Sequence, residues 1–267
     1  MLDIKNYVRV QSLQEAYDLC QNRRNVIIGG MLWLKMQNRS VDTAIDLCDL
    51  GLNQIEDKGD EIHIGAMVTL RQLELDPLLN EYTHHALKES VKHIVGVQFR
   101  NLATIGGSLF GRYGFSDVLT MFLALDAYVE LYHGGIVSIR EFVEMRPSLD
   151  ILVRIIVKKT PMQVVYLSQR NTQTDFPVLT CAISKMNQDY YCVIGARPLK
   201  ATLLLDEKHL LDSSLSDESI LAFADDIAQR VTLGSNLRGS ADYRRHLTKV
   251  LIKRALWQLR EEHNHGN

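Results

Sequence analysis

The chain has 267 residues, of which 46% are hydrophobic and 23% charged, a balance typical of a globular protein with its own core. Thirty basic and thirty-two acidic residues give a formal net charge of −2, which provides no basic field to attract nucleic acid or a membrane surface. Residues 1–17 carry scattered charges and no unbroken apolar stretch, so we expect no secretory signal and a cytoplasmic protein.

The first half of the chain predicts interleaved helices and strands. The expected elements, in chain order, are a helix over 12–22 capped by Ser12, a strand leading to Gly29 and Gly30, an apolar segment over 43–50, a strand from Ile62, and a helix with Thr69 as N-cap. A helical pattern over 82–96 follows, and a glycine-bearing segment interrupts it. A buried helix is then expected over 118–125.

The remaining pattern predicts strands first and helices last. The expected elements are paired strands over 127–132 and 135–137 around His133 and Gly134, strands over 149–158, 164–167, 178–185 and 190–196, and helices over 217–231 and 240–260. A change of character near Pro161 indicates a domain boundary there.

Four cysteines, Cys20, Cys48, Cys181 and Cys192, lie far apart in the sequence and within apolar runs. Iron–sulfur and zinc sites usually contain closely spaced pairs of cysteines. We therefore expect reduced, buried thiols and no metal site in this chain.

Two glycine pairs each follow or interrupt a β-branched apolar run: Gly29 and Gly30 after VII, and Gly106 and Gly107 inside ATIGGS. Glycine pairs let backbone N–H groups converge and let a ligand approach without meeting a Cβ, which suits a pyrophosphate. A tight turn without a ligand also explains a lone pair of this kind. Neither segment matches a Rossmann fingerprint or a P-loop.

Polar residues surround the second pair, and they include Arg100, Asn101 and Asp117. Asp117 is placed to accept hydrogen bonds from ribose hydroxyls, or equally to cap the helix over 118–125. Arg100 fits either the site or a surface salt bridge.

Several stretches resemble one protein family. IIGGMLWLKM, IHIGAMVTLRQLE, VQFRNLATIGGSL followed by FSD, and DILVRIIV occur in the order found in FAD-binding subunits or domains of molybdenum hydroxylases, a group that includes xanthine dehydrogenase, carbon monoxide dehydrogenase and 4-hydroxybenzoyl-CoA reductase. TDFPVLTCAIS, IGARP and SADYRRHL resemble the last domain of that family. The resemblance covers nearly the whole chain, and RN-x-ATIGG followed by SD is its most specific part.

The resemblance implies an α+β fold. A two-lobed FAD-binding domain is expected over 1–160, with a small α/β lobe at about 1–58, an α+β lobe at 59–160, and FAD between the lobes. A C-terminal domain over 161–267 is expected to hold a three-stranded antiparallel sheet covered by helices.

The resemblance also implies which residues hold FAD. Residues 28–36 would form the first pyrophosphate loop, and residues 104–108 the second, which Arg100 and Asn101 would brace. Asp117 would bind near the ribose and diphosphate, and Leu152 would pack on the isoalloxazine ring. The expected cofactor-binding residues are Ile28, Gly29, Gly30, Met31, Leu32, Trp33, Thr104, Ile105, Gly106, Gly107, Ser108, Asp117 and Leu152. No catalytic residue is expected.

The chain departs from the family pattern at several positions. Met31 and Leu32 stand where relatives commonly have polar residues, so backbone donors would have to hold the phosphates. Ser168 stands where some relatives have a lysine near the flavin, and Ser108 stands where asparagine is usual.

The resemblance implies the flavoprotein subunit of a multi-subunit oxidoreductase like xanthine dehydrogenase. FAD would take electrons from an iron–sulfur partner and pass them to NAD or another acceptor. The molybdenum cofactor and [2Fe–2S] clusters are expected on partner subunits, because the chain lacks cysteine clusters and room for a molybdenum domain.

Two other functions remain open. Met31, Leu32 and Ser168 favour a structural or assembly subunit with weak or lost FAD binding. A stand-alone FAD-dependent oxidase would need a base near the flavin, for which only His93 and His133 lie near the candidate segments.

Overall fold

A computed structural model describes residues 1–265, and their side chains as far as residue 261. The chain divides into two compact units, each built from separate stretches of sequence. The first unit comprises Met1–Leu73, Gly96–Gly111 and Ala127–Lys159, and the second comprises Glu74–Val95, Arg112–Asp126 and the chain from Thr160 onward. Within the described residues, every helix is too short or too polar to cross a membrane.

The first unit begins with a small parallel sheet. Its strands are β1 (Asp3–Arg9), β2 (Val26–Ile28) and β3 (Ser40–Asp46), in the order β1-β3-β2. Helix α1 (Leu13–Cys20) connects β1 to β2, and the Ser12 side chain accepts a hydrogen bond from the Glu15 N–H, as the sequence predicts. The pattern did not predict β1, because most of its residues are exposed and show no regular alternation.

A five-stranded antiparallel sheet forms the rest of the first unit. Its strands are β4 (Ile55–Asp57), β5 (Glu61–Gly65), β6 (Ala127–Leu131), β7 (Gly135–Ser138) and β8 (Leu152–Lys158), in the order β4-β5-β8-β6-β7. The expected hairpin around His133 and Gly134 is confirmed. The Asp150 carboxylate accepts hydrogen bonds from both of their N–H groups, at 3.1 and 2.8 Å. Because Asp150 supports this turn, β8 begins at Leu152 and not at residue 149.

Short helices lie between these strands. They are η1 (Leu34–Met36), η2 (Cys48–Leu50), α2 (Leu70–Leu75), α5 (Val97–Arg100), α6 (Ile105–Phe110) and α8 (Ile139–Glu144). Thr69 caps α2 as expected, because its hydroxyl accepts a hydrogen bond from the Gln72 N–H. The Gln72 side chain in turn accepts one from the Thr69 N–H at 2.9 Å, as in a capping box. Gly106 and Gly107 lie inside α6 and not in an open loop, because Thr104 caps a helix that begins at Ile105.

The second unit is built on an antiparallel sheet of four strands. They are β9 (Met162–Arg170), β10 (Pro177–Met186), β11 (Asp189–Gly195) and β12 (Thr202–Leu205), in the order β12-β11-β10-β9. The expected three-stranded sheet was therefore one strand short. β12 was missed because its four residues, TLLL, are too few to show a period of two.

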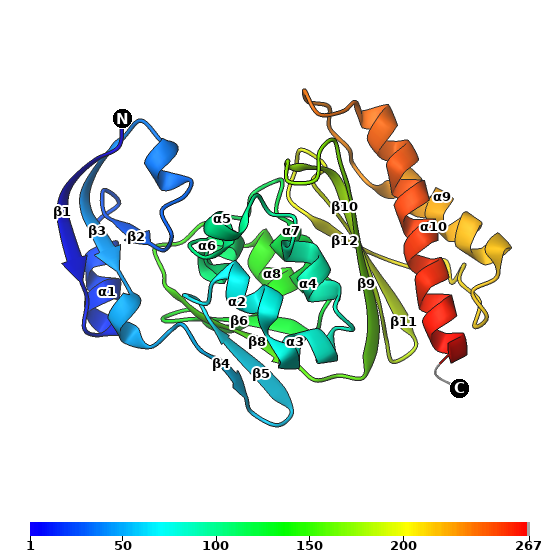
Figure 1. The fold of residues 1–267 in the computed structure, drawn as a ribbon, viewed down its shortest axis with the longest axis horizontal. Helices are drawn as coiled ribbons and strands as arrows, with labels where there is room; N and C mark the ends of the chain where they lie inside the picture. The colour runs from blue at the N-terminus through cyan, green and yellow to red at the C-terminus, as the bar shows by residue number, and fades with distance from the viewer. Residues whose placement is uncertain (266–267) are drawn as a thin grey trace. The chain divides into compact units, whose positions relative to one another are not determined.

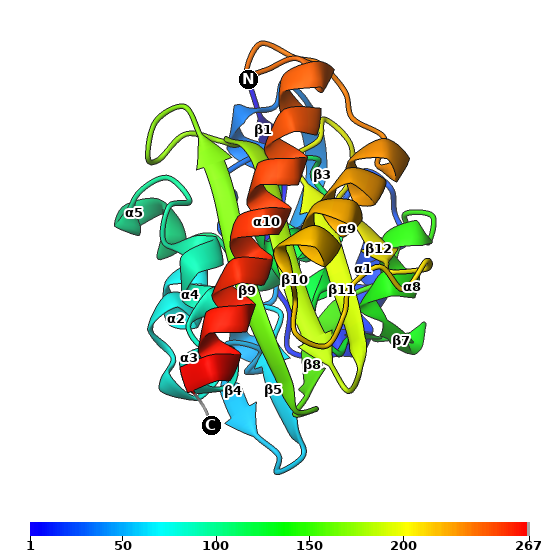
Figure 2. The ribbon, with the colours of Figure 1, turned by 90° about the vertical axis from the view of Figure 1, so that its right-hand side faces the viewer.

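Two long helices cover one face of this sheet. α9 (Asp217–Arg230) and α10 (Ala241–His265) lie side by side across β9, β10 and β11 (Figures 1 and 2). Ile183 and Ile194 of the sheet share a buried core with Phe223 and Leu256 of the helices. Both helices match the ranges that the sequence predicts.

The opposite face of the sheet carries α7 (Asp117–Leu123), and α3 (Pro77–Tyr82) and α4 (Ala86–Val91) belong to the same unit. Thr120 of α7 shares a hydrogen bond of 2.9 Å with Thr180 of β10. The single helical pattern expected over 82–96 was wrong. His84 and His85 have φ of +47° and +66°, and this left-handed backbone ends one helix and precedes the next.

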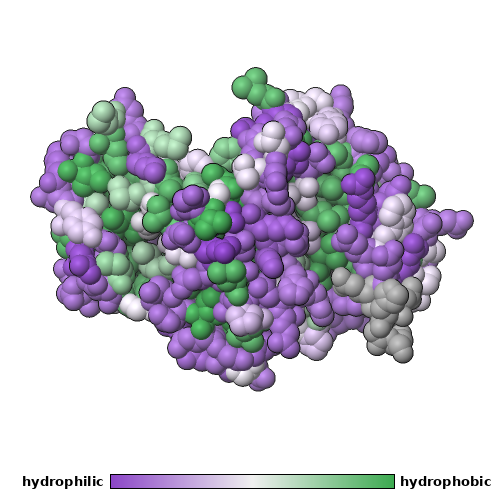
Figure 3. All heavy atoms as spheres, in the orientation of Figure 1, coloured by the Kyte–Doolittle hydropathy of each residue, from purple (hydrophilic) through white to green (hydrophobic). Residues whose placement is uncertain are grey.

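All four cysteines are free thiols, and Cys20, Cys181 and Cys192 are buried as expected. Cys48 is exposed, which corrects the prediction for that residue. Figure 3 shows a surface on which hydrophobic residues lie scattered among hydrophilic ones. The exposed face in this view thus has the mixed character that is normal for protein surfaces.

Candidate functional site

The two glycine segments lie against each other within the first unit. A Cβ added to Gly30 would lie 2.0 Å from the Leu102 carbonyl oxygen, and one added to Gly29 would lie 2.7 Å from Thr104 Oγ1. Real Cβ atoms do not come this close to backbone or side-chain oxygens. Gly29 and Gly30 are therefore required by the close approach of two protein segments, whatever ligand binds there.

Gly106 joins α6 to the five-stranded sheet. A Cβ at this position would lie 2.6 Å from the Ala66 carbonyl oxygen, which accepts a hydrogen bond of 2.9 Å from the Gly106 N–H. The Ala66 N–H in turn donates to the Val153 carbonyl at 3.0 Å. This chain of hydrogen bonds places α6 beside the start of β8, where Leu152 is 5% exposed.

Gly107 differs from the other three glycines. The nearest protein atom to an added Cβ would be Thr104 Oγ1, at 3.2 Å, and the residue is exposed. Thr104 Oγ1 also accepts a hydrogen bond from the Gly107 N–H. An added Cβ at Gly107 thus meets one hydroxyl, which would have to shift by a few tenths of an ångström, so the fold restricts this position less than the other three glycines. A ligand lying against α6 would restrict it further.

The first glycine segment offers unused hydrogen-bond donors. Among the described residues, no hydrogen bond is donated by the backbone N–H groups of Gly29, Gly30, Met31 or Leu32. Met31 has φ of +57°, a left-handed conformation that is rare outside glycine. A left-handed residue within a run of free N–H groups is the backbone pattern of anion-binding concavities.

The side chains of the first segment are apolar and half-buried. Met31, Leu32 and Trp33 supply no anionic or hydroxyl group, and the Trp33 ring meets the Phe99 ring edge-on at 5.6 Å between centroids. Ile28 is buried at the end of β2. Backbone atoms are therefore the polar groups that this segment presents.

In the second segment most donors are already used inside the protein. The Ile105 N–H donates to the Val68 carbonyl at 2.9 Å, and the N–H and hydroxyl of Ser108 both donate to the Thr104 carbonyl, at 3.0 and 2.9 Å. The Ile105 side chain is fully buried. The two glycine segments thus differ: the first presents free donors, and the second presents an open surface at Gly107.

Asp117 lies in the second unit and is 4% exposed. Its carboxylate accepts a 2.5 Å hydrogen bond from the Tyr166 hydroxyl and pairs with the Arg170 guanidinium. Burial raises the pKa of Asp117 to about 6 against the opposing effects of Arg170 and Tyr166. Ser116, and not Asp117, is the N-cap of α7.

Sequence reasoning missed these partners of Asp117. Tyr166, Ser168 and Arg170 alternate along β9 and so share one face of the sheet. The Arg170 Nε is buried without a hydrogen-bond partner among the described residues. The sequence shows the alternating Y-x-S-x-R pattern of β9. It does not show that these side chains contact Asp117 of α7, which lies far earlier in the chain. Ser168 provides no cation, but Arg170 provides one two residues further on.

The other residues named from the sequence have varied positions. Arg100 is 5% exposed, so it does not form the surface salt bridge that the sequence left open. Asn101 follows α5 as its C-cap and is exposed. The His133 ring stacks on Tyr17, with 4.1 Å between centroids. Among the described residues, no group of three His, Cys, Asp or Glu side chains is arranged to hold a metal ion.

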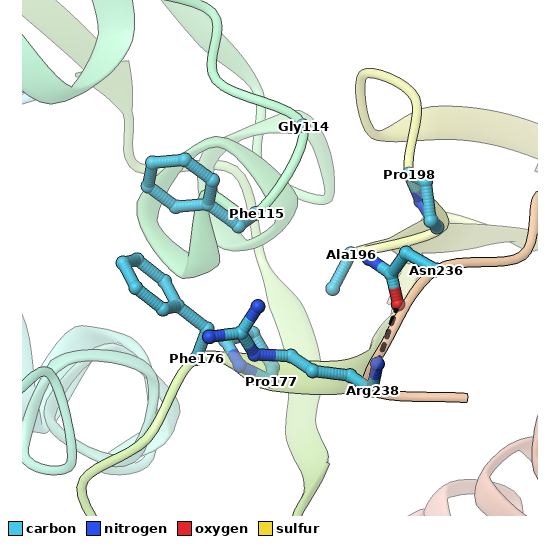
Figure 4. A pocket seen from close by; sticks show the side chains of 8 residues that line it. All are labelled: Gly114, Phe115, Phe176, Pro177, Ala196, Pro198, Asn236 and Arg238. Carbon is cyan, nitrogen blue, oxygen red and sulfur yellow. Dashed lines mark hydrogen bonds between the residues drawn. The ribbon is translucent and has the colours of Figure 1, made fainter.

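The family-like stretches of the second unit meet around a pocket of about 300 Å³. Phe115 and Phe176 form one wall, with their rings at 4.6 Å in an edge-to-face arrangement, and Arg238 extends beside Phe176 (Figure 4). Asn236 accepts a hydrogen bond from the Arg238 N–H. These residues come from the TDFP stretch, from the segment before α7 and from the loop before α10.

Arg244 supports that loop from inside. It is fully buried, and its guanidinium donates to the carbonyls of Val178, Gly234 and Gly239 and to the Asn236 side chain. Burial lowers the pKa of Arg244. Arg244, in the SADYRRHL stretch, therefore holds the loop that forms this wall of the pocket.

Comparisons with known proteins agree with this arrangement. Residues 2–159 match the family described as the FAD binding domain in molybdopterin dehydrogenase, and residues 166–259 match the CO dehydrogenase flavoprotein C-terminal domain. The glyceraldehyde dehydrogenase medium chain of Sulfolobus acidocaldarius is 26% identical, over 94% of this chain and 96% of its own length. The uncharacterized protein YgfM of Escherichia coli K12 is also 26% identical, over 93% and 94%.

Solved structures show the same fold. Quinoline 2-oxidoreductase from Pseudomonas putida 86 matches with a TM-score of 0.84 at 20% identity, covering 96% of this chain and 97% of its own. Carbon monoxide dehydrogenase from Hydrogenophaga pseudoflava also matches with a TM-score of 0.84, at 23% identity over 94% and 95%. Both matching family models describe flavoprotein domains. The chain belongs to the family of FAD-binding subunits of molybdenum hydroxylases.

Proposed function

We propose that this chain binds one FAD and serves as the electron-exit subunit of a molybdenum hydroxylase. The observation that carries the proposal is the pairing of four free N–H groups, at Gly29 to Leu32, with the open surface of Gly107. The first feature suits the charge of a pyrophosphate and the second suits its bulk. No polar side chain at Met31 or Leu32 is needed for this role.

The chain's own residues would act by binding and positioning. Residues 28–33 would donate backbone hydrogen bonds to the phosphates, and residues 104–108 would form the surface on which the diphosphate lies. Leu152, at the start of β8, would contact the isoalloxazine ring. FAD supplies the redox chemistry when bound, because a flavin can accept electrons singly and release them as a pair.

Asp117 is expected from the sequence to bind FAD, and its contacts in the fold add a second role. Its carboxylate is committed to Tyr166 and Arg170, so we propose that it positions the Arg170 cation as well as contacting the ribose and diphosphate region. Partner subunits would carry the molybdenum cofactor and the [2Fe–2S] clusters. Relatives with matching chains include the medium subunit of nicotine 6-hydroxylase from Paenarthrobacter nicotinovorans. The acceptor of the electrons would be NAD or another carrier.

The test is the spectrum of the purified complex and of the chain alone. We expect flavin absorbance that acid releases as FAD. A chain that remains colourless after FAD is added, both alone and with its partners, would favour the alternative of an assembly subunit. That alternative draws on Met31 and Leu32, whose side chains provide no polar contact for a flavin, and on Ser168, which provides no cation.

A further inference from the structure

A second pocket lies in the second unit, on the side of its sheet that faces α9 and α10. Its volume is about 250 Å³, and its wall includes Leu215, before α9, and Leu259, on α10. Gln163 of β9, Lys185 of β10 and Tyr190 of β11 also line it. None of these residues belongs to the glycine segments or to the stretches that resemble the flavin family.

The three sheet residues form one row across three strands. Gln163 is the register partner of Lys185, and Lys185 is the register partner of Tyr190. Directly opposed residues in an antiparallel sheet point to the same face. Since Tyr190 belongs to the core shared with α9 and α10, the whole row faces the helices.

The polar groups of this row lack protein partners. The Tyr190 hydroxyl is buried without a hydrogen bond among the described side chains, and the residue is 8% exposed. The Lys185 ammonium lies 5.5 Å from the Tyr190 ring centre, and among the described side chains no carboxylate pairs with it. A buried hydroxyl without a partner lowers stability, so a ligand that accepts a hydrogen bond from it would offset this loss.

The rest of the pocket adds donors and a second cation. Ser213 and Ser214 line it before α9, and Arg260 lines it from α10. Arg260 also donates to the Leu215 carbonyl and to Asp217, at 3.0 and 2.8 Å, so its position is fixed. Among the described residues that line the pocket, none is acidic.

We infer that this pocket binds a small tetrahedral oxyanion, a phosphate group either free or on a small phosphorylated molecule. Tyr190, Ser213 and Gln163 can donate to its oxygens from different directions, and Lys185 supplies the positive charge, since Arg260 already pairs with Asp217. The site is separate from the glycine segments and so does not depend on FAD binding.

The test uses inorganic phosphate, sulfate, glycerol 3-phosphate and acetate with the complex as purified. We expect phosphate and sulfate to raise its unfolding midpoint, and calorimetry to show at least a tenfold weaker affinity in Tyr190→Phe and Lys185→Met. Tyr191→Phe, on the opposite face of the same strand, and Lys249→Met, whose lysine pairs with Asp225 on the helices, are matched controls and should bind as the wild type does. Tighter binding of glycerol 3-phosphate would identify a phosphorylated molecule as the ligand, and equal or weaker binding would identify free phosphate.

Stability without ligand gives an independent readout. In phosphate-free buffer, Tyr190→Phe should unfold at the wild-type temperature or higher, because it removes a buried hydroxyl that has no partner. A lower midpoint would mean that the hydroxyl has a partner in the protein and would overturn the proposal. Equal affinity for acetate and phosphate, unchanged phosphate affinity in Tyr190→Phe, or no binding at millimolar phosphate would overturn it as well.

Discussion

The backbone of Gly30 lies so close to Leu102 that a single added carbon would fall 2.0 Å from the Leu102 carbonyl oxygen. This contact joins two segments that are about seventy residues apart in sequence. Gly29, Gly30 and Gly106 are therefore required by packing, whereas an added carbon at Gly107 would meet only the Thr104 hydroxyl, at 3.2 Å. The distinction separates substitutions that break the fold from those that affect a ligand.

Gly107→Val should weaken FAD binding by at least about tenfold, which is about 1.4 kcal/mol, while the chain stays folded. The branched side chain would project from an exposed position on α6, where its Cβ would lie 3.2 Å from the Thr104 hydroxyl. Gly30→Ala should instead lower the unfolding midpoint with or without FAD, because its methyl group meets the Leu102 carbonyl. Flavin fluorescence titration and thermal unfolding measure the two effects. Wild-type FAD affinity in Gly107→Val would place the diphosphate elsewhere.

The left-handed backbone at Met31 leads to a second prediction. Met31→Gly keeps the N–H and relieves the strained φ of +57°, so FAD affinity should be unchanged and stability should rise by about 1 kcal/mol. Met31→Pro removes the N–H and forbids a positive φ, so FAD should no longer be retained.

Leu32→Ala is the control for these two variants, since it alters only a side chain. FAD affinity in Leu32→Ala should stay within about twofold of the wild type, a free-energy change below about 0.5 kcal/mol. If truncating Leu32 released the flavin while Met31→Pro did not, side chains and not backbone donors would hold the phosphates.

The pKa of Asp117 predicts an unusual dependence of stability on pH. The group titrates near 6 in the folded chain and near about 3.9 in the unfolded chain, so the folded state holds its proton to higher pH. The stability of the wild type relative to Asp117→Asn should therefore fall as pH rises from about 4 to about 6, and then level off.

Asp226 should show the opposite sign. A hydrogen bond from Lys208 lowers the pKa of Asp226, with a further contribution from Arg230. Its stabilising effect is present above the unfolded pKa and is lost as pH falls through the folded pKa. Denaturant unfolding of Asp117→Asn between about pH 4 and 6, and of Asp226→Asn from about pH 5 to below about pH 4, tests both signs. A parallel response of the two variants would show that burial does not dominate at Asp117.

Asp117→Ala should destabilise the second unit by about 3–5 kcal/mol, because it leaves the Arg170 guanidinium buried without its carboxylate. Tyr166→Phe should cost less, about 1–2 kcal/mol, because it removes one hydrogen bond and keeps the ion pair. Chemical unfolding of the two variants gives the comparison. Equal losses would mean that the ion pair adds nothing beyond the tyrosine contact.

Partner dependence gives the most direct test of function. Hydroxylation should require the molybdenum and iron–sulfur subunits, and Gly107→Val in the full complex should slow reduction of the final acceptor. Substrate should still reduce the molybdenum and iron–sulfur centres in a single turnover of that variant. Spectra that follow the centres separately from the acceptor measure this. If the isolated chain oxidised substrate as fast as the complex does, the electron-exit assignment would be wrong.

Local patterns were enough to predict much of the fold. The hairpin at His133 and the helices α9 and α10 follow from turn residues and apolar periodicity, which depend on neighbours in sequence. Edge strands such as β1 and β12 carry weak patterns because little of their surface is buried. β1 is specified by its pairing with β3, more than thirty residues later, and β12 by its pairing with the preceding strand β11.

The candidate site was predictable only in part. The glycine pairs marked both segments, but the division of roles between them depends on which N–H groups the fold has already used. The carbonyl groups of Ala66 and Val68 accept hydrogen bonds from the N–H groups of Gly106 and Ile105, and only the folded structure shows these contacts. The Asp117 cluster was likewise hidden, because a carboxylate gives no sequence sign of the cation that will face it from another element.

The unequal constraints on the four glycines also have an evolutionary consequence. A descendant of this chain that no longer needed a flavin would still have to keep Gly29, Gly30 and Gly106, since the Thr104 side chain and the backbone of Leu102 and Ala66 fill the space around them. Position 107 would be free to drift to larger residues. Within this fold, the residue at that position can therefore serve as a marker that separates working flavoproteins from members that have become scaffolds, and this chain retains glycine there.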